Sequence, residues 1–170
     1  MAFVLTSPAF VNGDTLPQAQ VYNGMGQHGQ NLSPALEWKD APAGTKSFVV
    51  TVYDPDAPTG SGWWHWVVVN IPATITALPE GAGSAGDKLP KGAMQVRTDF
   101  GVPGYGGAAP PPGRVHRYVF TVYALDVPTL DVPTLDVQED SSPALVGFMV
   151  NHHKLASASL TALYGSGSRD

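Results

Sequence analysis

Three segments rich in β-branched and aromatic residues constrain the fold of this chain more than any other feature. They are KSFVVTVYD (residues 46–54), WWHWVVVNIP (63–72) and RYVFTVYAL (117–125). Each segment has few polar interruptions, which is typical of strands whose two faces are both covered. The sequence therefore predicts three central strands that are buried on both faces.

The rest of the chain favours turns and short strands, with one helix. The 170 residues include 19 glycines and 16 prolines, which is typical of a chain with many turns. Apolar residues at helical spacing over 144–163, with a capping serine before them and Gly165 after them, predict a helix. We expect a mainly β fold: a two-sheet antiparallel β-sandwich with this C-terminal helix packed at one edge, in a single domain over residues 1–170.

Composition argues against several classes of function. The net charge is −5 and the Lys and Arg residues are scattered, so no nucleic-acid partner is expected. There is no cysteine for a disulfide, a thiol nucleophile or a zinc site, and no cofactor is expected. No apolar run is long enough for an integral membrane segment, and no signal-peptide pattern opens the sequence, so we expect a cytoplasmic protein.

The stretch DPDAPTGSGWWHW (residues 54–66) combines turn residues with ionisable side chains. Asp and Pro are common in turns, so a turn alone would explain its first half. Strand alternation places Trp63, His65 and Val67 on one face. A histidine in such a strand needs a polar partner, because an unpaired buried polar group costs about 1–3 kcal/mol. We expect Asp54 or Asp56 on the adjoining turn to be that partner.

A second cluster lies in PPPGRVHRYVF (residues 110–120), at the end of a long Gly/Pro-rich loop. A loop of about forty residues in a compact domain is usually functional. Alternation sends His116 and Tyr118 to one side of the strand that follows. If the strands adjoin, one pocket collects both histidines, Tyr118 and the two carboxylates of the first stretch.

Three chemistries are compatible with such a pocket. A metal would use two histidines and a carboxylate, although the spacing matches no compact metal motif. An enzyme would use a His–Asp pair or paired carboxylates, although no G-x-S-x-G elbow for a Ser-His-Asp hydrolase is present. An anion site would use imidazoles whose pKa a neighbouring Asp raises, together with backbone N–H groups of the glycine-rich loop 99–113. We favour the anion site because it uses every unusual feature.

These segments resemble the phosphatidylethanolamine-binding protein family, specifically its bacterial Raf-kinase-inhibitor-like branch. The similarity runs nearly end to end, from NLSPALEW (31–38) through the D-P-D-A-P and H-R-Y motifs to VGFMVNHHKLASASLTALYG (146–165). The resemblance implies a β-sandwich with a small anion-binding cavity at one end and a cis peptide bond between Ala57 and Pro58. It assigns ligand binding to Asp54, Asp56, Ala57, Pro58, Trp63, His65, Gly106, Gly107, Pro110, Pro111, Pro112, His116 and Tyr118.

The sequence thus predicts a non-enzymatic, Raf-kinase-inhibitor-like binding or regulatory protein. Its pocket is expected to receive a phosphate, a phospholipid headgroup or a phosphorylated group, and no metal. His65 and His116 are expected to donate to the anion, Tyr118 to add a hydroxyl and Trp63 an apolar wall. The alternative is a hydrolase or protease inhibitor that uses the same Asp/His pocket. A protein partner such as a kinase or protease, and a homodimer, are both compatible with the sequence.

Overall fold

The computed structural model describes residues 1–84, 88–130 and 136–165. The larger sheet has the strand order β6 (Met94–Gln95), β4 (Trp63–Pro72), β3 (Ser47–Asp54), β7 (Val115–Leu125) and β8 (Lys154–Gly165). The smaller sheet has the order β1 (Val4–Thr6), β2 (Leu36–Lys39) and β5 (Ala77–Leu78). Neighbouring strands in both sheets are antiparallel. A short 3-10 helix η1 (Gln18–Gln20) and one α-helix α1 (Pro143–His153) complete these elements.

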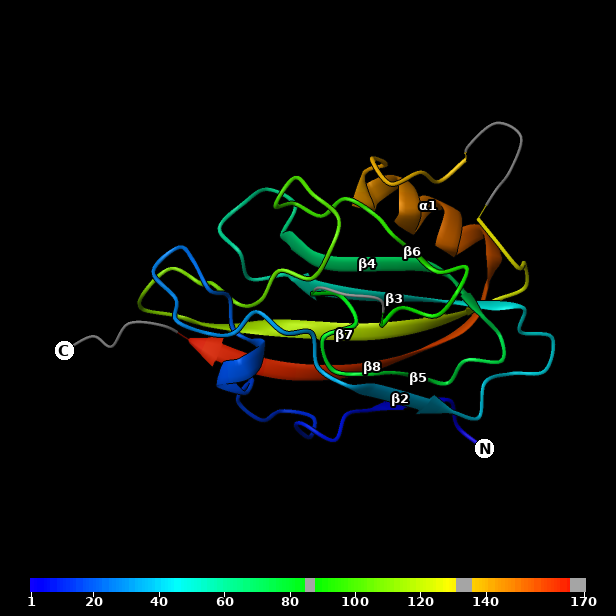
Figure 1. Ribbon diagram of the computed structural model, residues 1–170, viewed down its shortest axis with the longest axis horizontal. Helices are drawn as coiled ribbons and strands as arrows, with labels where there is room; N and C mark the ends of the chain where they lie inside the picture. Colours follow the sequence, from blue (N-terminus) through cyan, green and yellow to red (C-terminus); the bar gives the residue numbers. More distant parts are fainter. Residues whose placement is uncertain (85–87, 131–135, 166–170) are drawn as a thin grey trace.

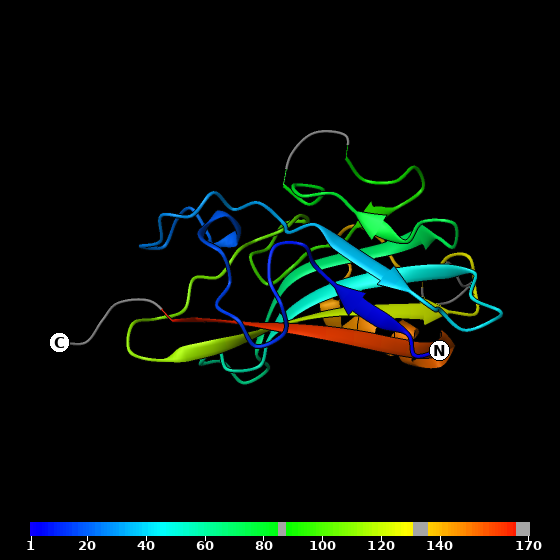
Figure 2. The ribbon, with the colours of Figure 1, turned by 90° about the horizontal axis from the view of Figure 1, so that it is seen from below.

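The two sheets and α1 form three layers (Figure 1). The smaller sheet lies over one face of the larger sheet, as Figure 2 shows from a second direction. Alternate residues of β3 face the two sides: Val50 and Val52 pack with Trp38 between the sheets, and Val49 packs with Met149 of α1. The mainly β, two-sheet antiparallel sandwich is therefore confirmed. The helix, however, covers the outer face of the larger sheet and does not lie at an edge.

The C-terminal helix is shorter than the sequence pattern predicts. It begins as expected, with Pro143 in its first turn and the Ser142 hydroxyl accepting a hydrogen bond from the Leu145 N–H at 3.1 Å. It ends at His153, and the segment expected to continue it is strand β8, which pairs with β7 along its length.

The reason lies in an alternating pattern that also fits helical spacing. In the segment ASASLTA (156–162), small or apolar residues alternate with Ser and Thr. Leu160 and Ala162 are buried, whereas Ser157 and Ser159 are exposed. This period of two is the strand period, and the long neighbouring strand β7 provides a pairing edge for it. Tertiary pairing thus overrides a local helix preference.

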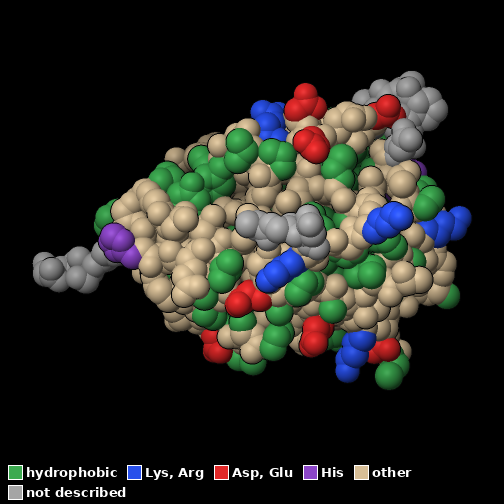
Figure 3. Space-filling view, in the orientation of Figure 1, with side chains coloured by type: hydrophobic (Ala, Val, Ile, Leu, Met, Phe, Trp, Pro, Cys, Tyr) green, Lys and Arg blue, Asp and Glu red, His purple; other side chains and the backbone are tan. Residues whose placement is uncertain are grey.

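The molecular surface shown in Figure 3 carries mixed charges. On this face, Lys and Arg side chains lie among Asp and Glu side chains and form no single basic patch. This face therefore offers no continuous positive surface to a nucleic-acid backbone. Within the described ranges, no helix is long and apolar enough to cross a membrane.

Candidate functional site

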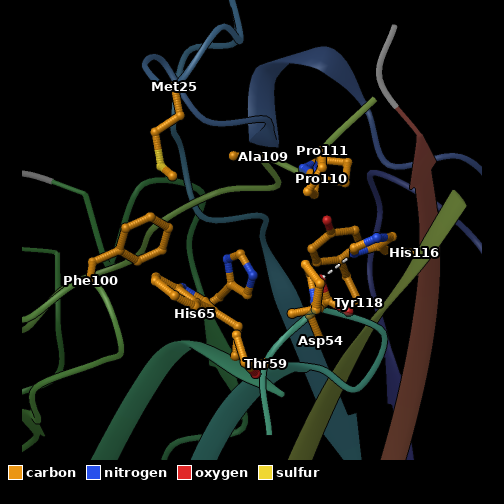
Figure 4. A pocket seen from close by; sticks show the side chains of 13 residues that line it. Met25, Asp54, Thr59, His65, Phe100, Ala109, Pro110, Pro111, His116 and Tyr118 are labelled. Carbon is orange, nitrogen blue, oxygen red and sulfur yellow. Dashed lines mark hydrogen bonds and ion pairs between the residues drawn. The ribbon is translucent and has the colours of Figure 1, made fainter. Parts of the chain in front are cut away.

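A pocket of about 200 Å³ opens where β3 ends and where β4 and β7 begin. In Figure 4, Met25 and Phe100 lie on one side of this space, Asp54, His116 and Tyr118 lie on the other, and His65 lies between them. The prolines of the loop before β7 close it from above in this view. The residues that line it are Met25, Asp54, Ala57, Pro58, Thr59, Trp63, His65, Phe100, Ala109, Pro110, Pro111, His116 and Tyr118.

His65 reaches the pocket because β4 carries a bulge. The β3 partners of Trp64 and Trp66 are adjacent residues, so His65 between them is the extra residue of the strand pair. A bulge of this kind shifts the alternation by one position. Trp66 accordingly packs between the sheets, and Val67 packs in the cluster beneath α1. The expectation that His65 and Val67 share a face is therefore wrong.

The polar partner of His65 is a backbone carbonyl. Its Nδ1 lies 2.7 Å from the carbonyl oxygen of Gly106, and the Gly106 N–H donates to the His65 carbonyl at 2.9 Å. The sequence prediction of an aspartate partner for His65 is thus wrong. Burial lowers the pKa of His65 below its ordinary value of 6.5, and the Gly106 carbonyl opposes this only in part.

Asp54 instead pairs with His116. Its Oδ2 lies 2.7 Å from His116 Nδ1, and both side chains are almost fully buried. Its Oδ1 accepts a hydrogen bond from the Asp56 N–H at 2.7 Å, which stabilises the turn after β3. Asp54 therefore holds one pocket histidine and one pocket loop at the same time.

Asp56 points away from the pocket. Its carboxylate accepts two hydrogen bonds from the Arg117 guanidinium, at 2.9 and 3.0 Å, and a third from the Arg117 backbone N–H. The side-chain bond to Arg117 lowers the pKa of Asp56 from 3.8 to about 2. Of the two aspartates expected in the pocket, Asp54 lines it and Asp56 is not among its lining residues.

Two buried hydrogen-bond donors of pocket residues have no partner among the described residues. They are the hydroxyl of Tyr118, a residue that is 2% exposed, and the indole N–H of Trp63. Burial raises the pKa of Tyr118, and the neighbouring Asp54 carboxylate raises it further, so the hydroxyl keeps its proton. Such orphaned donors are uncommon in folded proteins, and they mark this pocket as polar in its chemistry despite its mostly apolar lining.

The sequence profile described as "Phosphatidylethanolamine-binding protein" matches residues 6–165. The chain belongs to this family. It is 61% identical over 153 residues to the UPF0098 protein YbhB of Escherichia coli, covering 90% of this chain and 94% of that protein. It is 54% identical over 165 residues to the UPF0098 protein YbcL of the same organism, covering 96% of this chain and 87% of that protein.

Solved structures of family members have the same fold. The crystal structure of Escherichia coli YbcL, described as a new member of the mammalian PEBP family, superposes with a TM-score of 0.92 at 52% identity. That comparison covers 98% of this chain and all of the other. A homologue from Chlamydia trachomatis superposes with a TM-score of 0.79 at 32% identity and covers 98% of this chain and 99% of the other.

The glycines assigned to the site by resemblance serve the loop and do not line the pocket. The Gly106 N–H is used by the His65 carbonyl, and the Gly107 N–H donates to the Asn31 side chain at 2.7 Å. A Cβ at Gly106 would run into the ring of Phe100, and one at Gly107 into the backbone of residues 20–22. These two N–H groups are therefore not available to a ligand, contrary to the sequence prediction.

The remaining assigned residues divide between two neighbouring hollows. Pro110 and Pro111 line the pocket, whereas Pro112 lines an adjoining groove of about 540 Å³ that shares Met25, Ala109, Pro110 and Pro111 with it. The described residues contain no cis peptide bond, so the cis bond expected before Pro58 is not observed.

Four lining residues were missed by the sequence reasoning: Met25, Thr59, Phe100 and Ala109. The only signal for them was that they lie in the Gly-rich loops on either side of the predicted strands.

The lining limits the chemistry of the site. None of the described residues that line the pocket is Lys, Arg, Ser or Cys. The Thr59 hydroxyl donates to the Gly62 carbonyl at 2.7 Å. In the described part of the chain, no three His, Asp or Glu side chains are grouped to hold a metal ion. What the pocket offers is two imidazoles, one carboxylate, one phenol and one indole N–H.

Proposed function

We propose that this chain is a non-enzymatic binding or regulatory protein whose pocket receives a small anionic group of the phosphate or carboxylate type. The observation that carries the proposal is the pair of buried, unpartnered donors, the Tyr118 hydroxyl and the Trp63 indole N–H. A buried donor without a partner costs about 1–3 kcal/mol, and a bound oxyanion supplies the missing acceptor. Hydrogen bonds from neutral donors to a charged acceptor are the stronger kind.

The two histidines have different roles in this pocket. His116 is held by Asp54 through Nδ1, so its Nε2 is the nitrogen left for a ligand. When both ring nitrogens are protonated, the ring forms an ion pair with Asp54 and donates to the anion. His65 is held by a neutral carbonyl and sits among aromatic rings, with Phe100 and Tyr118 in edge-to-face contact with it.

Binding is favoured over catalysis by the lack of an activated nucleophile in the lining. Asp54 accepts two hydrogen bonds, and the one hydroxyl besides Tyr118, that of Thr59, donates to a backbone carbonyl. A carboxylate engaged in this way orients its neighbours and is a poor nucleophile. The geometry of the pocket therefore fits the binding of a ligand better than a chemical reaction on it.

Titration calorimetry with inorganic phosphate tests the proposal. We expect binding near pH 6 that weakens near pH 8, and a loss of at least about tenfold in affinity for Trp63→Phe, which removes one donor to a charged group. The matched control is Trp38→Phe: its indole N–H is also buried without a described partner, but it lies in the smaller sheet. Absence of phosphate binding in the millimolar range, or equal losses for both variants, would overturn the proposal.

The alternative of a hydrolase is separated by turnover assays with chromogenic phosphate and acyl esters. We expect no turnover above the rate of the uncatalysed reaction. Turnover that disappears in Asp54→Ala or His116→Ala would show that the pocket is catalytic and not only a binding site.

A further inference from the structure

We propose that Asn23 is a site of spontaneous covalent modification, where the side-chain amide is converted into the carboxylate of aspartate or isoaspartate. The reaction consumes water and releases ammonia. The chain has five asparagines, and two of them, Asn12 and Asn23, are followed by glycine. A following glycine favours the reaction because no Cβ shields its backbone nitrogen. The fold blocks the reaction at Asn12 and leaves it open at Asn23.

The chemistry requires the glycine nitrogen to reach the side chain before it. The Gly24 N–H gives its proton to a solvent base, and the nitrogen attacks Cγ of Asn23. The bond from Cγ to the amide nitrogen breaks, and that nitrogen takes up a proton and leaves as ammonia. The product is a succinimide ring. Water then opens the ring at one of its two carbonyls, which gives aspartate or the β-linked isoaspartate.

Asn12 and Gly13 are held by strand β8 in a way that opposes ring formation. The Asn12 Oδ1 accepts a hydrogen bond from the Thr161 N–H at 2.8 Å, and the Gly13 N–H donates to the Thr161 carbonyl at 2.7 Å. The attacked group and the attacking nitrogen are thus both bound to one residue of the neighbouring strand. Both hydrogen bonds have to break before the nitrogen can reach Cγ, so the folded state protects this pair.

Asn23 and Gly24 have no such protection. Asn23 is exposed, and within the described ranges neither its side-chain amide nor the Gly24 N–H forms a hydrogen bond. The Gly24 carbonyl accepts from the Gln27 N–H at 2.9 Å, so the fold fixes the turn that follows and not the peptide group between Asn23 and Gly24. Exposed side chains change rotamer within nanoseconds, so Asn23 Cγ can approach the Gly24 nitrogen without unfolding of the chain.

The modified residue lies on the loop that brings Met25 to the pocket. Met25 lines both the pocket and the adjoining groove, and its side chain extends from this loop toward Phe100 (Figure 4). Met25 and Gly26 have left-handed backbone conformations, with φ of 53° and 83°, in the turn closed by the bond from Gln27 to Gly24. Isoaspartate adds one carbon atom to the backbone directly before this turn, and both products add a negative charge. The reaction therefore changes the rim of the pocket irreversibly.

Peptide mapping by mass spectrometry, on folded protein incubated at pH 8, tests the proposal. We expect Asn23 to be converted at least about tenfold faster than Asn12, because only Asn12 has to break two hydrogen bonds first. In the same chain unfolded in guanidinium chloride, the two rates are expected to agree within about threefold, since the protection of Asn12 is lost. A ratio below tenfold in the folded protein, or an equally large ratio in the unfolded chain, would overturn the proposal.

The variant Gly24→Ala tests the attacking nitrogen. Its Cβ shields the nitrogen, and the conversion of Asn23 is expected to fall at least about tenfold while that of Asn12 stays unchanged. The φ of Gly24 lies outside the left-handed region, and the nearest atom to the added Cβ is on the Tyr22 ring at 3.1 Å, so the fold is expected to persist. Unchanged conversion of Asn23 would show that Gly24 is not the nucleophile. The comparison of folded and unfolded wild type does not depend on this variant.

Carbon-13 NMR of the methionine methyl groups tests the effect on the pocket. In the isoaspartate form, separated from the unmodified protein by ion exchange, the Met25 signal is expected to move. The signal of Met149, which is buried under α1, is expected to stay in place. A Met25 signal that does not move would refute the claim that the modification changes the rim of the pocket. This readout involves no ligand, so it stands apart from the proposed anion binding.

Discussion

The unpartnered hydroxyl of Tyr118 gives a prediction in which stability and binding change in opposite directions. The residue is 2% exposed, and its hydroxyl makes no hydrogen bond of regular geometry with a described residue, although the Asp54 carboxylate lies near enough to interact with it. Leaving a buried donor unpaired costs about 1–3 kcal/mol, so Tyr118→Phe removes this cost but leaves a small void where the oxygen was. We expect the ligand-free variant to be more stable than the wild type by about 1 kcal/mol, which raises Tm by about 2–4 °C for a chain of this size.

Tyr105 offers a matched control with the opposite sign. It is also buried, but its hydroxyl donates to the Gln20 carbonyl at 2.7 Å. Tyr105→Phe leaves that carbonyl unpaired, and we expect a loss of about 1–2 kcal/mol in the free energy of unfolding. The two substitutions remove the same atom from similar surroundings, so the difference in sign isolates the missing partner of Tyr118.

Urea and thermal unfolding of both variants, each without and with phosphate, provide the assay. Phosphate satisfies the wild-type hydroxyl, so Tyr118→Phe is expected to lose about tenfold in phosphate affinity and to gain less Tm from added phosphate. A Tyr118→Phe protein that is less stable than the wild type, with unchanged phosphate affinity, would refute the reasoning. It would mean that the hydroxyl serves the fold through Asp54 and not the ligand.

Three further predictions test the loops and the charges. Gly106→Ala drives a Cβ into the Phe100 ring and is expected to lower the free energy of unfolding by about 1–3 kcal/mol in urea, whereas Gly60→Ala, with open space around it, changes it by less than about 0.5 kcal/mol. The pKa of His65 is lowered on folding, so below pH 6.5 the unfolded chain binds one proton more than the folded chain, and the free energy of unfolding is expected to fall as the pH drops. Urea titrations near pH 7.5 and pH 5.5 should show a smaller fall for His65→Gln than for the wild type. Asp56→Asn is expected to cost about 1 kcal/mol or less, and to change phosphate affinity measured by calorimetry by less than about threefold, because its partner is an exposed guanidinium outside the pocket.

The central strands could be predicted from the sequence because their signal is local. Residues 63–72 form an apolar segment with few polar interruptions, and β4 has these bounds in the structure. The segment 154–165 failed because its small residues fit both a helix and a strand, and only the neighbouring strand β7 decides between them. Pairing with a strand far away in the sequence cannot be predicted from the residues of the segment alone.

The positions of the candidate site were easier to predict than its hydrogen bonds. The sequence predicts one pocket for Asp54, His65, His116 and Tyr118, and all four line it, although a bulge and not strict alternation places His65 there. The hydrogen-bond partners differ from those expected, however. Asp54, one of the two carboxylates expected to pair with His65, pairs with His116, and Asp56 pairs with Arg117. Two aspartates separated by one residue carry equivalent sequence signals, and only the register of β3 against β7 distinguishes them.

The bulge at His65 shows why the difference between the expected and the observed hydrogen-bond partners matters for function. The extra residue in β4 coincides with a ring that faces a carbonyl of the loop beyond Phe100. A carbonyl oxygen only accepts hydrogen bonds, so His65 Nδ1 carries the hydrogen in this contact. A shift of one residue in a strand thus accompanies a change in the hydrogen-bond partner of a pocket histidine, from an expected carboxylate to a backbone carbonyl.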